Sequence, residues 1–274
     1  MKRVAPPILE PQVVARLAAL QQSIDQIQDY AERVTTGKAK WDKRPEALFN
    51  HVRSGLALTC SGNRRCHYCE DSMADEIEHM RPKDLYPEGV FQLSNYLLSC
   101  GPCNGPKNNQ FAVILGSGAA GPELMDVTRR RNALVTPPQA GVPALLDIRV
   151  DDPIECIWLD FQTGLYTSNV DDPGSEISLR VDYTLRLLRL NTRDDLVRGR
   201  RAAYSMYLAR LRMFVEYHSN WTDVERSKFI EDFRVERYRS VWERMMKYRE
   251  FTPELDQLFA SRPLKYQPQT HAVA

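Results

Sequence analysis

The sequence contains no apolar run that approaches the ~20 residues needed to cross a bilayer, and this excludes a membrane-spanning helix. Its first residues carry positive charge without an apolar core, so no secretory signal is indicated and we expect a cytoplasmic protein with reduced thiols. Six cysteines in 274 residues are too few for a disulfide scaffold, and no internal repeat is evident. A net charge of +1 neither indicates nor excludes nucleic-acid binding.

Apolar residues make up 43% of the chain, which is enough for a sizeable core in one or two domains. Their spacing at steps of three and four, together with break signals, predicts several helices. The predicted helices are 11–35, 45–58, 194–217, 222–249 and a short one after Pro253. The partly alternating apolar and polar residues of 154–169 predict a β-hairpin around Gly164. We expect residues 112–145 to form a loop-rich connection and the polar tail from Gln267 to be frayed. We therefore expect an α+β, mainly α-helical protein.

Four of the six cysteines form two C-x2-C pairs, Cys66 with Cys69 and Cys100 with Cys103. Each pair can place two thiolates on one side of a tight knuckle. Two such knuckles brought together give the closed four-sulfur site that is typical of structural Zn²⁺. The 30 residues between the pairs exceed the roughly 15–20 of a zinc ribbon, so we expect a folded insert between the knuckles.

Two disulfides or a redox-active cysteine pair are the alternatives to zinc. A disulfide needs an oxidising compartment, and the redox motif needs one C-x2-C near a βαβ pattern rather than two flanking pairs. His67 lies inside the first knuckle and is a candidate to replace one cysteine ligand. Cys60 and Cys156 fit no metal spacing, and we expect them to be ordinary buried thiols.

The insert carries polar residues that are suited to hydrolysis. His79 follows Glu78 at the end of a short predicted strand, and a neutral imidazole can take a proton from water near neutral pH. A carboxylate such as that of Glu78 is a ligand that Mg²⁺ prefers, and the amide oxygen of Asn104, next to the last cysteine, is a second hard ligand. Lys107 places a cation where a phosphate would lie.

These residues carry a specific resemblance. The segment 66–107 resembles the HNH endonucleases, which are ββα-metal nucleases, in the type, order and spacing of eight positions. The resemblance implies that His79 is the general base, that Glu78 and Asn104 bind a catalytic metal, and that Asn95 braces the loop carrying the histidine. It also implies a structural Zn²⁺ on the cysteines. These are Cys66, Cys69, Cys100 and Cys103.

The chain departs from the family pattern at two positions. Glu78 stands where aspartate is more usual, and its extra methylene moves the carboxylate oxygens outward from the position of an aspartate ligand. Asn104 replaces the final histidine, which favours Mg²⁺ or Mn²⁺ as the catalytic metal, because an amide oxygen is a harder ligand than imidazole. The resemblance places a zinc-stapled ββα nuclease module at 60–112, between an N-terminal helical region, 1–59, and a C-terminal region of hairpin and helices, 113–274.

The residues within these motifs resemble those of a narrower group, the retron-associated and Septu-type HNH proteins of bacterial anti-phage defence. This likeness implies a DNA substrate, with RNA as a further possibility, and an ABC-type ATPase as partner. Arg81, Lys83 and Lys107 are candidate phosphate contacts. Residues 177–213, with nine Arg and three Asp, can equally contact a phosphate backbone or an acidic partner. The alternatives to a nuclease are a non-catalytic zinc module that binds nucleic acid and a structural subunit that docks the ATPase.

Overall fold

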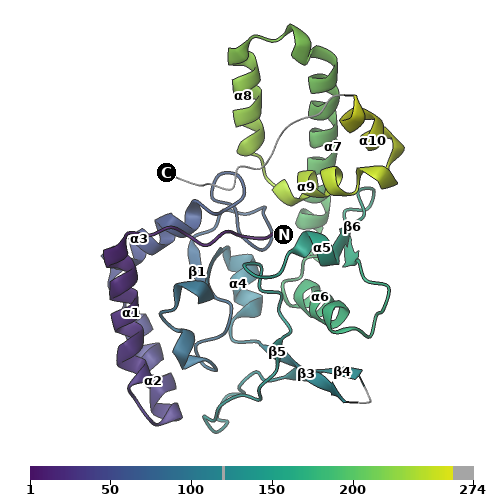
Figure 1. Ribbon diagram of the computed structural model, residues 1–274. Coiled ribbons are helices and arrows are strands. Elements are labelled where there is room, and N and C mark those ends of the chain that lie inside the picture. Colours follow the sequence, from purple (N-terminus) through teal and green to yellow (C-terminus); the bar gives the residue numbers. More distant parts are fainter. Residues whose placement is uncertain (119–120, 262–274) are drawn as a thin grey trace.

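The computed structural model describes residues 1–118 and 121–261 (Figure 1). The fold is mixed α+β and mainly helical, with small antiparallel sheets set among the helices. No helix in these ranges is both long enough and apolar enough to span a membrane. The tail predicted from Gln267 lies outside the described residues.

Three helices form the N-terminal region: α1 (Pro11–Asp25), α2 (Tyr30–Asp42) and α3 (Glu46–Ala57). The prediction of one helix over 11–35 is wrong, because the chain breaks after α1 and restarts at Asp29, whose side chain caps α2 by accepting from the backbone N–H of Glu32 at 2.8 Å. The apolar residues keep their helical spacing across this break, so the sequence pattern did not indicate it. The predicted helix over 45–58 is confirmed as α3.

The predicted insert contains two strands, and a helix begins directly after it. Strand β1 (Glu76–His79) pairs antiparallel with β2 (Tyr96–Ser99), so that His79 lies opposite Tyr96, and helix α4 (Gly101–Lys107) follows at once. The connection between the strands contains two 3₁₀ turns, η1 (Pro87–Gly89) and η2 (Leu93–Asn95). This order places the end of β1 beside α4, the helix that carries Cys103.

The segment 112–145, which we predicted to be loop-rich, contains a three-stranded sheet. Its strands β3 (Ala112–Gly118), β4 (Gly121–Asp126) and β5 (Val142–Pro143) pair in the order β4-β3-β5. The start of β3 is buried, so its apolar residues run continuously instead of alternating with polar ones. The sequence therefore lacks the alternation of apolar and polar residues by which we predict strands, and β3 was not predicted.

The predicted hairpin is confirmed with shorter strands, β6 (Ile157–Leu159) and β7 (Tyr166–Ser168), joined through Gly164 at a φ of 77°. A single helical turn, α5 (Pro153–Cys156), precedes it in place of the expected strand residues. Gly164 is needed there, because a Cβ atom would lie 2.4 Å from the carbonyl oxygen of Val197 as well as requiring a left-handed backbone.

The C-terminal half contains the remaining helices. They are α6 (Glu176–Leu187), α7 (Asp194–Tyr217), α8 (Asp223–Arg234), α9 (Arg239–Lys247) and α10 (Pro253–Ala260), with 3₁₀ turns η3 (His218–Asn220) and η4 (Arg249–Phe251). Helix α7 has the predicted bounds. The prediction of one helix over 222–249 is wrong, because Tyr238 adopts a left-handed conformation, with φ 54°, between α8 and α9. Helices α7 and α8 pack through aromatic rings and form the projecting hairpin of Figure 1.

Candidate functional site

The four paired cysteines meet at one point. Their sulfur atoms all lie within 4.8 Å of one another, each side chain is buried, and the sulfurs of Cys69 and Cys100 are 3.8 Å apart. Four sulfurs placed about 2.3 Å from a central Zn²⁺ would be separated by about 3.8 Å, so the spacing suits a tetrahedral site. Burial raises the pKa of the Cys66 thiol, because a thiolate is costly there without a cation beside it. The donor set therefore fits a structural Zn²⁺, and all six cysteines are free of disulfides.

Arg193, which the sequence did not point to, reaches this cluster from the start of α7. Its Nη1 donates to the sulfur of Cys103 at 3.5 Å. An N–H donor beside a metal-binding thiolate fixes the ligand and reduces its charge. Arg193 and Cys103 are 90 residues apart in the sequence, so no local motif predicts this contact.

His67 lies outside the cysteine cluster and has its own partners. Its Nδ1 accepts from the backbone N–H of Leu98 at 3.0 Å, and its Nε2 lies 3.2 Å from the Thr59 hydroxyl. Burial lowers the pKa of His67 to about 3, so the ring is neutral. Its position joins the first knuckle to β2, and the only four-ligand cluster among the described residues is the one made by cysteines.

His79 ends β1 and is 7% exposed. Its Nε2 lies 2.9 Å from the carbonyl oxygen of Val90, and because a carbonyl only accepts, the ring proton must be on Nε2. No residue that the structure describes hydrogen-bonds Nδ1, which therefore keeps its lone pair. Trp41 and Tyr96 hold the ring edge-on, with centroids at 4.3 and 5.2 Å. The imidazole is thus fixed in both orientation and tautomer.

Burial and charge both keep His79 neutral. Desolvation is the largest cause that lowers its pKa to about 3, and the cations of Lys83, Lys107 and Arg44 lower it further, while the Val90 carbonyl acts in the opposite direction. A neutral ring at pH 7 is the form that can accept a proton. An anion placed among these cations would raise the pKa of His79 and make it a stronger base.

Asn95 ties down the chain on the far side of His79. Its side-chain oxygen accepts from the backbone N–H of Arg81 at 2.8 Å, and its Nδ2 donates to the carbonyls of Arg81 and Gly89 at 2.9 and 3.0 Å. A Cβ atom at position 89 would lie 2.9 Å from Nδ2, so glycine is needed for this approach. The loop that leaves His79 is held at both ends by one amide.

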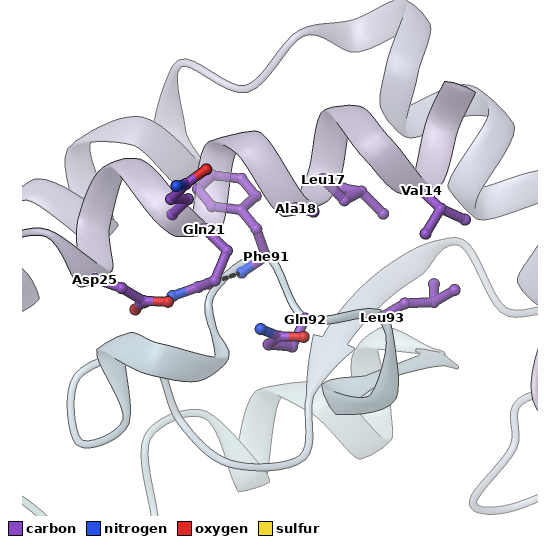
Figure 2. Close-up of a pocket in the computed structure, with 9 residues that line it drawn as sticks. Val14, Leu17, Ala18, Gln21, Asp25, Phe91, Gln92 and Leu93 are labelled. Carbon is purple, nitrogen blue, oxygen red and sulfur yellow. Dashed lines mark hydrogen bonds between the residues drawn. The ribbon is translucent and has the colours of Figure 1, made fainter. Parts of the chain in front are cut away.

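Helix α1 contacts the same loop through Gln21 (Figure 2). The buried Gln21 accepts from the backbone N–H of Phe91 at 2.8 Å and donates to the Pro87 carbonyl at 3.1 Å. These bonds lie on either side of Val90, whose carbonyl orients His79. Sequence reasoning missed Gln21, because a polar residue on an amphipathic helix has no visible link to a loop 70 residues away.

Glu78 and Lys107 form a buried ion pair that the sequence did not predict. Both side chains are fully enclosed, and the ammonium also donates to the His79 carbonyl at 2.7 Å. The second carboxylate oxygen of Glu78 accepts from the Tyr68 hydroxyl at 2.8 Å. Lys107 therefore faces the interior, where its ammonium is paired with Glu78, whereas we predicted it to contact a phosphate.

Asn104 and Glu78, the two metal ligands implied by the resemblance, do not face one another. The Nδ2 of Asn104 donates to the exposed Glu76 carboxylate at 2.5 Å, whereas both Glu78 oxygens have internal partners. The residues as placed do not fit a Mg²⁺ or Mn²⁺ held between Glu78 and Asn104. We did not predict a role for Glu76. It lies on the same face of β1 as Glu78, because side chains two residues apart on a strand point to the same side.

The candidate phosphate contacts lie on the loop after β1. Lys83 is half-buried, its pKa is lowered mainly by burial, and no described residue hydrogen-bonds or pairs with its ammonium. Arg81 is exposed, and its guanidinium lies 5.4 Å from the centre of the Tyr86 ring. Both cations remain available to a ligand, in contrast to Lys107.

Six of the nine arginines in the stretch 177–213 have partners within the protein. Five of its arginines form ion pairs with carboxylates, and a sixth is buried against backbone carbonyls. These are Arg180, Arg193, Arg198, Arg210 and Arg212, and then Arg200. Part of the positive charge of this stretch is therefore neutralised within the fold, while the side chains of Arg198 and Arg212 remain more than half exposed beside their partners.

Comparison with known proteins gives a partial match. No family model matches the chain. A segment of 57 residues is 46% identical to the Septu protein PtuB of Bacillus thuringiensis, and it covers 19% of this chain and 22% of that protein. The match thus spans about a fifth of either chain, and it supports a relation between this protein and the Septu proteins.

Proposed function

We propose that this protein is an endonuclease that hydrolyses phosphodiester bonds in nucleic acid, with His79 as general base. The observation that carries the proposal is the state of His79: a neutral ring whose proton is fixed on Nε2 by the Val90 carbonyl and whose Nδ1 has no partner among the described residues. A ring held in this way has one free lone pair in a fixed direction, which is what abstraction of a proton from water requires.

The proposed reaction follows from this geometry. Nδ1 of His79 takes a proton from a water molecule as the water oxygen attacks phosphorus. The bond from phosphorus to the leaving oxygen breaks, and this oxygen takes up a proton from solvent water. Lys83 and Arg81 supply positive charge toward the negative charge that develops on the phosphate. Asn95 and Gln21 position the loops on either side of the imidazole and do not touch the substrate.

The resemblance implies a catalytic Mg²⁺ or Mn²⁺ beside His79. Glu78 and Asn104 have other partners, so no step is assigned to a metal held between them. The structural Zn²⁺ is proposed for the four cysteines, where it would fix the start of α4 against the first knuckle. Metal analysis of the purified protein should find one zinc per chain, and Cys100→Ser should lose it while Cys156→Ser keeps it.

The similarity to PtuB supports a role in anti-phage defence. DNA as the substrate, with RNA as a further possibility, and an ABC-type ATPase as the partner are proposed from the resemblance to Septu-type and retron-associated HNH proteins. Phage plating on cells that carry the wild type or His79→Ala, with and without a co-expressed ABC-type ATPase of a Septu system, tests this setting. Equal protection by both alleles would contradict a nuclease effector.

Plasmid nicking is the direct test of the proposed activity. We expect His79→Ala to lose cleavage by at least about a hundredfold, since a positioned general base contributes about 10²–10⁴-fold, while its zinc content stays unchanged. Its thermal unfolding should remain cooperative, with a lower midpoint because the buried ring leaves a cavity. The matched control is His51→Ala, an exposed histidine on α3, which should cleave as wild type does. The assay is run with Mg²⁺, with Mn²⁺ and with a chelator, both for the isolated protein and for any copurifying complex. Full cleavage by His79→Ala would refute the role of His79.

A non-catalytic zinc module that binds nucleic acid or docks a partner is the second candidate. The observation that favours it is the packing of His79 among Trp41, Tyr96 and Val90, which is also how a structural core histidine is held. On this alternative, replacing His79 by a residue of similar shape would leave phage protection unchanged, and the cysteine variants alone would lose it.

A further inference from the structure

Both cysteine knuckles are contacted by the C-terminal helices, which lie outside the HNH-like segment. At the second knuckle, Nη1 of Arg193 donates to the sulfur of Cys103 at 3.5 Å. At the first knuckle, the carbonyl of Glu70 accepts from the backbone N–H of Tyr238 at 3.4 Å, and its buried carboxylate accepts from the backbone N–H of Ser240 at 3.1 Å. The start of α7 and the start of α9 therefore hold one cysteine pair each.

Arg193 occupies the N-cap position of α7, where arginine departs from the local preference. Ser, Thr, Asp and Asn are favoured there because their side chains accept from the first backbone N–H groups, and Arg193 makes no such bond. Its side chain leaves the helix instead. Nη1 donates to the Cys103 sulfur, and Nη2 donates to the Asp195 carboxylate at 3.0 Å. A position that breaks a local rule in favour of a distant contact is typical of a functional role.

The charge of the metal site explains why a cation is useful at this point. A Zn²⁺ ion with four thiolates carries two net negative charges. In the part of the chain that the structure describes, Arg193 is the one charged side chain that donates to these four sulfurs. The Asp195 carboxylate shares the guanidinium and offsets part of its charge. A charge-assisted hydrogen bond still draws electron density from the Cys103 sulfur and fixes its direction.

Helix α7 is itself packed closely against the residue that holds the first knuckle. A Cβ atom at Gly199 would clash with the Tyr238 hydroxyl, so the helix backbone lies directly on this ring. One turn of α7 is also anchored from within. The buried Arg200 donates to the carbonyls of Gly164 and Leu190 at 2.6 and 2.9 Å. The contact of α7 with Tyr238 therefore determines where the guanidinium of Arg193 lies.

We propose that Arg193 is a positioning residue for Cys103, and that through it the retention of the structural Zn²⁺ depends on the contact between α7 and Tyr238. This inference rests on the zinc site proposed above and not on the nuclease activity. The dependence is reciprocal, since two sites coupled in free energy affect each other equally. Zinc therefore stabilises the docking of α7, and the C-terminal helices complete a metal site whose four ligands lie in the HNH-like segment.

Zinc affinity of the full chain, measured by competition with a chromophoric chelator, tests the role of Arg193. Arg193→Gln should weaken zinc binding by about 10–100-fold, the loss typical of partners that hydrogen-bond a metal ligand. Arg193→Lys should recover part of the affinity, because an ammonium keeps the charge and a donor. The matched control is Arg198→Gln, which removes an exposed arginine that pairs with Asp194 in the same helix, and it should bind zinc as wild type does.

Cobalt substitution separates this role from a contribution to folding alone. Loss of the N–H donor increases the electron density on the Cys103 sulfur, so the thiolate-to-metal charge-transfer band of the Co²⁺-loaded protein should move to longer wavelength in Arg193→Gln. Arg198→Gln should leave the band in place. A residue that served only the packing of α7 would lower the thermal unfolding temperature without shifting the band, and this result would overturn the proposal.

Hydrogen exchange tests the coupling in the other direction. Removal of zinc from the wild type should speed amide exchange in the first turns of α7, and zinc-loaded Arg193→Gln should already show part of this increase. Equal zinc affinity of Arg193→Gln and wild type, or exchange in α7 that does not respond to zinc, would overturn the proposal. A wild-type chain that binds no zinc would overturn the zinc site as well. Absence of cleavage alongside the expected zinc results would refute the nuclease activity alone.

Discussion

The ion pair between Glu78 and Lys107 is the residue-scale feature that departs most from the sequence pattern. A lysine three positions after Asn104 reads as a surface phosphate contact, but the chain folds its ammonium against a carboxylate and the His79 carbonyl. The pairing joins residues 29 apart across a strand and a helix, and no local rule predicts it. Burying two charges costs free energy that their attraction only partly offsets, so the pair specifies geometry more than it adds stability.

Lys107→Met should therefore be strongly destabilising. It leaves the Glu78 carboxylate buried with only the Tyr68 hydroxyl as partner, and removal of one member of a buried pair costs about 3–5 kcal/mol. The double variant Glu78→Gln with Lys107→Met should recover part of this loss, because no unpaired charge remains. Urea unfolding of zinc-loaded protein measures both values. A single variant that loses under about 1 kcal/mol would show that the pair is not buried as described.

The two buried histidines give stability a specific pH dependence. The pKa of His67 is about 3 in the fold against about 6.5 in an unfolded chain, so between these values the unfolded state binds more protons. The free energy of unfolding should therefore fall as the pH drops from about 7 toward 3, and His67→Asn should fall less steeply. Urea unfolding at pH 5 and pH 7, with zinc content measured at each pH, tests this. Parallel losses in both proteins would contradict it.

At the scale of elements, predictability depended on whether a signal was local. Cysteine spacing located the cluster, and apolar periodicity located α3 and gave the bounds of α7. Apolar periodicity did not predict the break at Tyr238, where one left-handed residue divides a helical pattern. It also did not predict β3, whose buried apolar residues do not alternate with polar ones. The candidate site divides in the same way. His79 and Asn95 lie within one segment, whereas Trp41 and Gln21 reach that segment only through the fold.

The contact between α1 and the loop before β2 can be tested through Gln21. Gln21→Leu should destabilise the protein by about 1–3 kcal/mol, because it leaves the backbone N–H of Phe91 buried without a partner. If the loop then shifts the Val90 carbonyl, the orientation of His79 is lost and kcat should fall with little change in KM. The neighbouring exposed Gln22 provides the control, Gln22→Leu. A variant at Gln21 with normal kcat but reduced stability would limit the role of this residue to folding.

At the scale of the whole molecule, contacts cross the boundaries that we predicted at residues 59 and 112. Trp41 packs on His79 from the N-terminal region, and Arg193 donates to Cys103 from the C-terminal one. The buried Arg244 of α9 donates to the carbonyls of Met1, Pro153 and Ile157, and so joins three distant parts of the chain. The HNH-like segment is therefore held from both sides by elements that its own motif does not include.

An excised segment 60–112 should bind zinc but lose the environment of His79. Without Trp41 and Gln21 the imidazole gains solvent, so its pKa should rise from about 3 toward its ordinary value of about 6.5, because burial is the main cause of the shift. NMR titration of the zinc-loaded segment and of the full chain measures both values. A longer piece, 1–112, restores α1 to α3 and should restore the low pKa. A segment 60–112 whose His79 still titrates near pH 3 would show that the N-terminal helices do not build this site.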